Sequence, residues 1–133
     1  MKKIKAYVEK SDYGFSVYME DNDLDYGIIG EGKTATEAIN DFRQAYEEMR
    51  DFYKEEGKDF EEVDFEFVYD IASFLQYYAF AFTLAGLERI TGVNQRQLSH
   101  YINGVSKPTR RTIEKIEDGI HNFSRDLSMV RFI

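Results

Sequence analysis

The sequence predicts an α+β protein with two domains, a first of order β-β-β-α-β over residues 1–70 and an all-α second over residues 71–133. Two observations predict this division. Near both ends of the first region, apolar and polar side chains alternate with the period of a strand. Between these ends lies one long segment in which apolar side chains recur at helical spacing. After residue 70 the apolar side chains recur only at helical spacing, between residues that favour helix ends. A chain of 133 residues is long enough for two small domains.

Four segments of the first domain have the pattern of strands. Residues 2–9 and 15–20 alternate apolar and polar side chains, and the turn-forming residues 11–14 between them predict a hairpin. A short third strand is expected over residues 26–30, and alternation over 63–69 predicts a fourth. We therefore expect a three- or four-stranded antiparallel sheet covered on one face by a helix.

The covering helix has the clearest pattern in the chain. Thr34 and Glu37 have the spacing of a capping box, in which the hydroxyl of the first residue and the carboxylate of the second bond to backbone N–H groups at the start of a helix. The helix is expected to end before Gly57. Its apolar side chains recur at i, i+3, i+4 and i+7, at Ala35, Ala38, Ile39, Phe42, Ala45, Tyr46, Met49, Phe52 and Tyr53.

Four helices are expected in the second domain, over residues 71–80, 84–91, 95–103 and 112–127. Asp70, Thr83 and Asn94 have side chains that favour the first position of a helix, and each stands directly before one of the first three. The last helix is amphipathic, and the side chains expected to point inward are Ile113, Ile116, Ile120, Phe123 and Leu127.

The second and third of these helices form a predicted helix-turn-helix. The first of the pair ends at Thr91 and Gly92, Val93 fills the turn, and the second runs to Asn103. The side chains expected to join the pair are Leu87, Ile90, Val93, Leu98 and Ile102. Long or polar side chains remain on the outer part of the second helix, where they could exchange hydrogen bonds with base edges; they are Gln95, Arg96, Gln97, Ser99, His100 and Asn103.

Charge is divided unevenly along the chain, whose net charge is −8. Residues 1–70 hold 9 basic and 20 acidic side chains, whereas residues 71–133 hold 8 basic and 5 acidic ones. Between Arg89 and Ile113 there is no acidic residue. Basic side chains in this stretch would meet a phosphate backbone, and we expect Lys107, Arg110 and Arg111 to contact it. The acidic first domain would suit a basic protein partner.

An acidic loop follows the second predicted strand. It holds Glu20, Asp21, Asp23 and Asp25, and Glu31 comes soon after. Three interpretations are open: a solvated loop, a surface that faces a basic partner, or the metal site of a nuclease of the RNase-H type. The spacing matches no common ligand motif. Because there is no cysteine and the two histidines are isolated, we expect no metal, no cofactor and no enzymatic activity.

Nothing in the sequence predicts secretion or a membrane. The first residues lack the apolar run of a signal peptide, and the uncharged segment over residues 71–87 is too short and too polar for a full span. The lack of cysteine fits a reducing compartment. We therefore expect a cytoplasmic protein.

Two resemblances to known families coincide in this chain. Residues 7–10, 14–17, 30–34 and 36–38 resemble the HicB antitoxin domain. Residues 91–104, with Lys107 and Pro108, resemble the helix-turn-helix of the Cro and phage-repressor class. The resemblance implies a HicB-like first domain, with a partial RNase-H-like fold, followed by a DNA-binding domain.

The same resemblance implies an antitoxin of a type II toxin–antitoxin pair. Such proteins block a small HicA-type toxin that cleaves mRNA, and they repress their own operon. The expected partners are therefore operator DNA and a HicA-like toxin, and reading of two half-sites implies a homodimer or a higher even oligomer. Dimerisation could use the sheet or the apolar residues 128–133. The alternative is a stand-alone transcriptional regulator whose first domain dimerises or senses a ligand.

Overall fold

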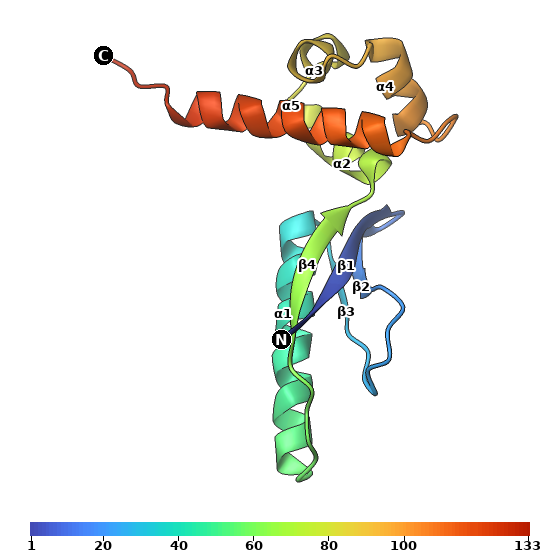
Figure 1. The fold of residues 1–133 in the computed structure, drawn as a ribbon, viewed down its shortest axis with the longest axis vertical. Helices are drawn as coiled ribbons and strands as arrows, with labels where there is room; N and C mark the ends of the chain where they lie inside the picture. The colour runs from blue at the N-terminus through green and yellow to red at the C-terminus, as the bar shows by residue number, and fades with distance from the viewer. The chain divides into compact units, whose positions relative to one another are not determined.

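The computed structural model describes residues 1–133 and has the predicted α+β class. The chain forms two compact units, Met1–Ser73 and Phe74–Ile133, and Figure 1 draws both. The predicted boundary was at residue 70, three residues earlier. Ser73 explains the difference, because its Oγ accepts a hydrogen bond from the Lys10 N–H at 3.0 Å and donates one to Asp70 at 2.7 Å.

The first unit contains a four-stranded sheet of β1 (Lys2–Ser11), β2 (Gly14–Met19), β3 (Ile29–Gly32) and β4 (Val63–Tyr69), in the order β3-β2-β1-β4. β1 pairs antiparallel with β2, and β2 with β3, but β4 runs parallel to β1. The expectation of a wholly antiparallel sheet was therefore wrong. The helix between β3 and β4 returns the chain to the end of the sheet where β3 began, so β4 runs in the same direction as β3. Because β3 and β1 both run antiparallel to β2, β4 is parallel to β1.

β3 lies later in the chain than the predicted strand over residues 26–30. Tyr26 and Ile28 are buried, but they precede the strand. The Tyr26 hydroxyl donates to the Glu61 carbonyl at 2.7 Å, and its ring stacks on Phe60. The alternating burial of Tyr26 and Ile28 therefore comes from packing against other parts of the unit, and not from membership of a strand.

One helix, α1 (Ala35–Glu55), covers one face of the sheet (Figure 1). Its predicted cap is confirmed, since Thr34 Oγ1 accepts the Glu37 N–H at 3.1 Å and the Glu37 carboxylate accepts the Lys33 N–H at 2.9 Å. Phe42 is fully buried, and its ring meets those of Phe65 and Phe67 edge-on. This aromatic cluster joins the helix to β4.

α1 lies very close to the edge of the sheet at Gly30. A Cβ atom at this position would lie 2.4 Å from the Ala38 carbonyl oxygen and 2.5 Å from the Phe42 nitrogen. Only a residue without a side chain allows this approach. Gly30 therefore fixes the distance between β3 and the helix.

The second unit is helical. It contains most of α2 (Ile71–Tyr77), the 3₁₀ turn η1 (Tyr78–Phe80), α3 (Leu84–Thr91), α4 (Gln95–Ile102) and α5 (Arg110–Ser128). The helix predicted over residues 71–80 thus ends in a 3₁₀ turn. α4 ends one residue before the predicted end, and α5 begins two residues before the predicted start because Thr109 caps it.

α5 packs against α3 through its first half. Ile116 is buried, and Ile113 and Ile120 are half-buried. The expectation that Leu127 points into the core was wrong, since 57% of its surface is exposed, whereas Phe123 is 37% exposed and its ring lies 6.2 Å from that of Phe82.

Candidate nucleic-acid interface

A tight turn joins α3 to α4. Gly92 has φ of 75°, the left-handed conformation that favours glycine, and its N–H donates to the Glu88 carbonyl at 2.7 Å. Val93 follows and is buried. The buried Thr91 hydroxyl donates to the Leu87 carbonyl at 2.8 Å and accepts the Val93 N–H at 3.1 Å. The turn is therefore fixed by its own hydrogen bonds.

Side chains hold α4 at both ends. Asn94 Oδ1 accepts the Gln97 N–H at 2.8 Å, and Glu88 Oε1 of α3 accepts the Gln95 N–H at 2.9 Å. These acceptors satisfy N–H groups that a helix start leaves free. At the other end, Gln76 Nε2 of α2 donates to the Ile102 carbonyl at 2.8 Å. α4 is thus held to both α2 and α3.

The outer face of α4 carries the residues predicted to read DNA. Leu98 and Tyr101 are buried and define the inner side. Arg96, His100 and Asn103 follow at i, i+4 and i+7, a spacing that aligns side chains on one face. Gln95, Arg96, Gln97 and Asn103 are exposed, whereas Ser99 and His100 are half-buried. Five of the six predicted residues therefore reach the surface from α4, and Asn103 does so from the C-cap that follows it.

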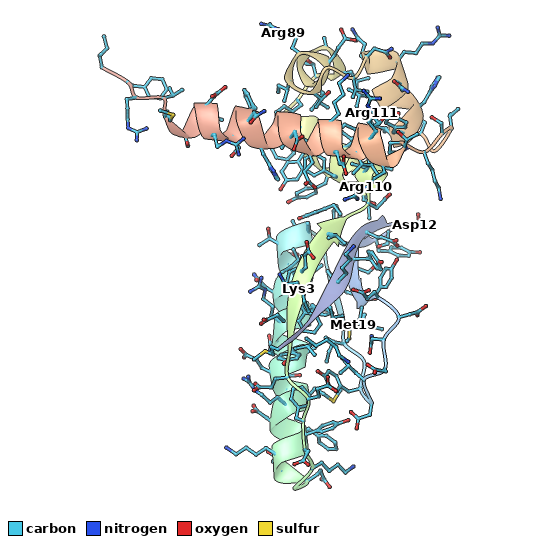
Figure 2. All side chains as sticks on the ribbon, viewed as in Figure 1. Lys3, Asp12, Met19, Arg89, Arg110 and Arg111 are labelled. Carbon is cyan, nitrogen blue, oxygen red and sulfur yellow. The ribbon has the colours of Figure 1, made fainter.

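Basic side chains lie at the start of α5 and in the loop before it. Lys107, Arg110 and Arg111 are exposed, and Figure 2 labels the two arginines on α5. Arg110 Nε lies 3.3 Å from Glu114 Oε1, but both side chains are largely exposed. An exposed pair of this kind is weak and screened by salt. The three cations are therefore available to phosphates.

Lys115 was not among the predicted site residues, yet it lies beside the turn. A Cβ atom at Gly92 would be 3.1 Å from Lys115 Cε and 3.6 Å from its Nζ. This ammonium group is therefore close to the turn that joins α3 to α4. The packing of α5 on α3 brings it there, and no local pattern in the sequence marks it.

Three of the four acidic loop residues have partners within the first unit. Asp23 Oδ1 is 2.6 Å from Lys2 Nζ, the Glu20 carboxylate accepts the Lys5 N–H, and Asp25 Oδ1 accepts the Tyr53 hydroxyl at 3.1 Å. The hydrogen bond from Lys2 lowers the pKa of Asp23 and raises the pKa of Lys2. Asp21 alone is exposed without such a bond. The loop is therefore tied to β1 and α1, and no group of three or more acidic or histidine side chains is placed to hold a metal.

An apolar row crosses the sheet on the face opposite α1. The strand register places Ile29, Tyr18, Tyr7 and Val68 next to one another, one from each strand. Ile29 is 65% exposed and Tyr18 is 37% exposed, and the two tyrosine rings are 5.5 Å apart. We name these four residues the open-face row. The side chains alternating with it on the same face are mostly acidic and include Glu9, Glu31, Asp64, Glu66, Lys3 and Lys5.

The pKa of the Tyr18 hydroxyl, in the open-face row, is raised. The hydroxyl donates to Glu9 Oε1 at 2.6 Å, and this hydrogen bond to a carboxylate is the main reason that the pKa of Tyr18 rises to about 12. The bond stabilises the folded state below the ordinary tyrosine pKa of 10.0, and its contribution is lost as pH rises toward 12. We expect Glu9→Gln to lower the pKa of Tyr18. The pKa of Tyr18 is measured from tyrosinate absorbance, as the difference between titrations with and without Tyr18→Phe. If Glu9→Gln left this pKa unchanged, the hydrogen bond to Glu9 would not be its cause.

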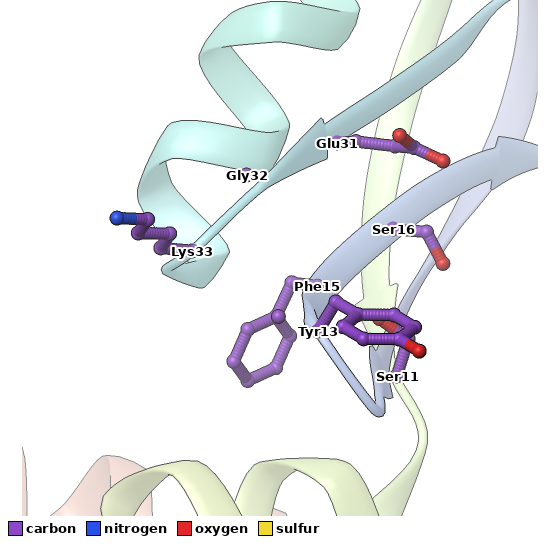
Figure 3. A pocket seen from close by; sticks show the side chains of 8 residues that line it. Ser11, Tyr13, Phe15, Ser16, Glu31, Gly32 and Lys33 are labelled. Carbon is purple, nitrogen blue, oxygen red and sulfur yellow. The ribbon is translucent and has the colours of Figure 1, made fainter.

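A shallow pocket lies between the β1–β2 turn and the start of α1 (Figure 3). Tyr13 and Phe15 contribute rings, and Glu31 and Lys33 are its charged residues. Tyr13 is 96% exposed. The pocket lacks a convergent set of polar groups of the kind that orients a small ligand.

Comparison of the chain with family models, curated proteins and solved structures gave no match. The helices of the structure include none with the length and apolar character needed to cross a membrane.

Proposed function

We propose that the protein is an antitoxin that represses its own operon by sequence-specific DNA binding through the second unit and neutralises a HicA-like, mRNA-cleaving toxin through the first. Neither role includes catalytic turnover. The outer face of α4 is the observation that carries the proposal. It supports the assignment of α3, the Gly92 turn and α4 as a helix-turn-helix of the Cro and phage-repressor class.

The chemistry of α4 suits the major groove, which admits a helix. Arginine can bond to the two acceptors of guanine, and glutamine or asparagine to the donor and acceptor of adenine. Arg96 and Gln97 lie in the first turn of α4, where a recognition helix contacts base edges. The hydrogen bonds that Asn94 and Glu88 accept and that Gln76 donates hold the helix before DNA arrives, so that little ordering is required on binding.

Phosphate contacts would come from the cations around α4. Lys107, Arg110, Arg111 and Lys115 are exposed on the loop and the first turns of α5. Such contacts fix the position of a protein on the duplex but carry no sequence information. We therefore assign the recognition of bases to α4 and contact with the DNA backbone to the start of α5 and the loop before it.

The first unit supplies a surface that fits a basic protein. The open-face row is apolar and its surroundings are acidic, which combines a contact patch with attraction for a cationic partner. We propose a HicA-like toxin as that partner because residues of the first unit resemble the HicB domain in sequence. The acidic loop is less suited to this role than its sequence implied, because Glu20, Asp23 and Asp25 are bonded within the unit.

The DNA proposal is tested with the full chain and a duplex from upstream of its own gene. We expect binding at least about 10³-fold tighter than to a scrambled duplex of equal length, as is usual for specific recognition. Fluorescence anisotropy over a series of salt concentrations measures both affinities. Equal affinity for the two duplexes would contradict the proposal.

The toxin proposal is tested by co-purification with the product of the adjacent gene. We expect Ile29→Lys to weaken the complex at least about tenfold, because it places a cation in the centre of a contact with a basic partner. Phe52→Lys is the control, since Phe52 is 50% exposed on α1 and lies outside the row. If no neighbouring product binds the wild-type chain, the stand-alone regulator replaces the antitoxin.

A further inference from the structure

The two edges of the sheet differ in how their backbone groups are paired. At one edge, β3 has only four residues, and the Glu31 N–H donates to the Asp41 carboxylate of α1 at 2.8 Å. At the other edge, β4 has seven residues and pairs with β1 alone. Because proteins usually shorten or cover an exposed edge, the long edge of β4 is the place in this sheet where a further strand could add.

Hydrogen bonds at the first residue of β4 identify its outward backbone groups. The Tyr46 hydroxyl accepts the Val63 N–H at 3.1 Å and lies 3.4 Å from the Val63 carbonyl oxygen, so the backbone groups of Val63 point away from β1. Alternate residues of a strand direct their backbone groups to the same side. Phe65 and Phe67 therefore also point outward, and no other group of the chain pairs with their N–H and carbonyl groups.

The side chains of Phe65 and Phe67 lie on the face of the sheet that α1 covers. Both are half-buried, and with Tyr46 they line a shallow groove between α1 and β4. The Arg43 guanidinium lies over the Phe67 ring, 4.9 Å from its centroid. An added strand would place side chains over these rings. The rings favour apolar side chains there, and Arg43 disfavours a second cation.

On the opposite face, β1 and β4 form a ladder of opposite charges. The register places Lys3 next to Asp64 and Lys5 next to Glu66, and all four side chains are exposed. Opposite charges side by side on neighbouring strands are favourable, and like charges are unfavourable. A strand added beside β4 is therefore favoured if it places Lys or Arg next to Asp64 and Glu66. Pairing of β4 with β4 of a second copy about these residues would instead bring carboxylates together.

We infer that the β4 edge accepts, as a fifth strand, an extended segment of a partner protein in which every second residue is Lys or Arg and the residues between are apolar. The outward groups of Phe65 and Phe67 supply the main-chain hydrogen bonds of such strand addition, and the two faces select the side chains. The excess of acidic side chains in residues 1–70 attracts a basic segment. A run of consecutive basic residues fits less well, because half of them would lie on the side of Arg43.

The test uses the full chain and a fluorescein-labelled peptide as long as β4, seven residues, in which Lys and Val alternate from a Lys at the start. We expect saturable binding, measured by fluorescence anisotropy. A control peptide has the same Lys and Val residues in two separate blocks, and therefore the same charge. It should bind at least about tenfold more weakly, because it cannot suit both faces of the strand. Equal affinities, or no binding of the alternating peptide, would overturn the inference.

A charge reversal on β4 tests the selection of side chains. Glu66→Lys should weaken binding of the alternating peptide by about fivefold, because it opposes like charges across the new strand pair. Glu48→Lys makes the same change on the exposed surface of α1, outside the groove, and should leave the affinity nearly unchanged. Circular dichroism checks that both variants are folded. Equal losses would mean that only net charge attracts the peptide, and the assigned edge would be wrong.

Amide hydrogen exchange, followed by NMR on the full chain, locates the bound peptide. The outward N–H groups of Phe65 and Phe67 should exchange readily in the free chain, and the alternating peptide should slow their exchange at least about tenfold. The Glu66 N–H points toward β1 and is the internal control. Binding without protection at Phe65 and Phe67 would overturn strand addition. The peptide requires neither DNA nor a toxin, so its result is separate from that of the proposed function.

Discussion

Replacing Phe42 by alanine should lower the free energy of unfolding of the first unit by about 3–5 kcal/mol. The side chain is fully buried, and its ring meets Phe65 at 4.8 Å and Phe67 at 5.6 Å between centroids. The substitution removes both contacts and leaves a cavity where α1 crosses the sheet. Urea denaturation followed by circular dichroism measures the change as a shift of the transition midpoint.

Phe52→Ala is the matched control, since Phe52 belongs to the same helix but is half exposed. Its effect should remain within about 0.5 kcal/mol, as for other surface substitutions. Because the chain forms two compact units, Phe42→Ala should also leave the DNA affinity of the second unit intact. Equal destabilisation by the two variants would contradict the assigned core.

Arg96→Ala should reduce the affinity for the operator by about 1–3 kcal/mol if the guanidinium bonds to a base, and it should relax specificity at one position. Lys107→Ala should instead weaken binding to all sequences and reduce the slope of log affinity against log salt by about one. The two variants therefore separate base reading from phosphate contact. Titrations of specific and scrambled duplexes at several salt concentrations distinguish them.

Arg125→Ala controls for the loss of one positive charge. Arg125 is exposed on the later part of α5, where its guanidinium bonds to the Asn122 side chain. Its removal should change operator affinity much less than removal of Arg96. Comparable losses would mean that Arg96 contributes only general charge, and the assignment of α4 as the reading helix would be wrong.

Features that depend on a few neighbouring residues could be predicted from the sequence. Thr34, Thr83 and Asn94 each cap the expected helix, because a hydroxyl or amide oxygen reaches the N–H three residues later. The alternation that predicted β1, β2 and β4 follows equally from local geometry. For the same reason the outer face of α4 could be predicted, since helical spacing alone determines which side chains oppose Leu98.

Features that depend on contacts distant in the chain could not be predicted. Strand alternation gives the faces of β4 but not its direction, which depends on how α1 returns the chain. The open-face row requires the register between strands, which no single strand contains. Lys115 lies beside Gly92 only because α5 packs on α3. Leu127 fits the amphipathic spacing of α5 yet is 57% exposed, because that spacing does not reveal how much of the helix its unit covers.

The close contact of α1 with β3 has a consequence for the tolerance of this gene to mutation. Every missense codon change at Gly30 adds at least a Cβ atom, and that atom would overlap the backbone of Ala38 and Phe42. Gly27, three residues earlier, has no atom within 4 Å of the corresponding position. Under selection for function, Gly30 should therefore persist among sequences that diverge freely at Gly27. Gly30 therefore marks a position at which two backbone segments are in direct contact.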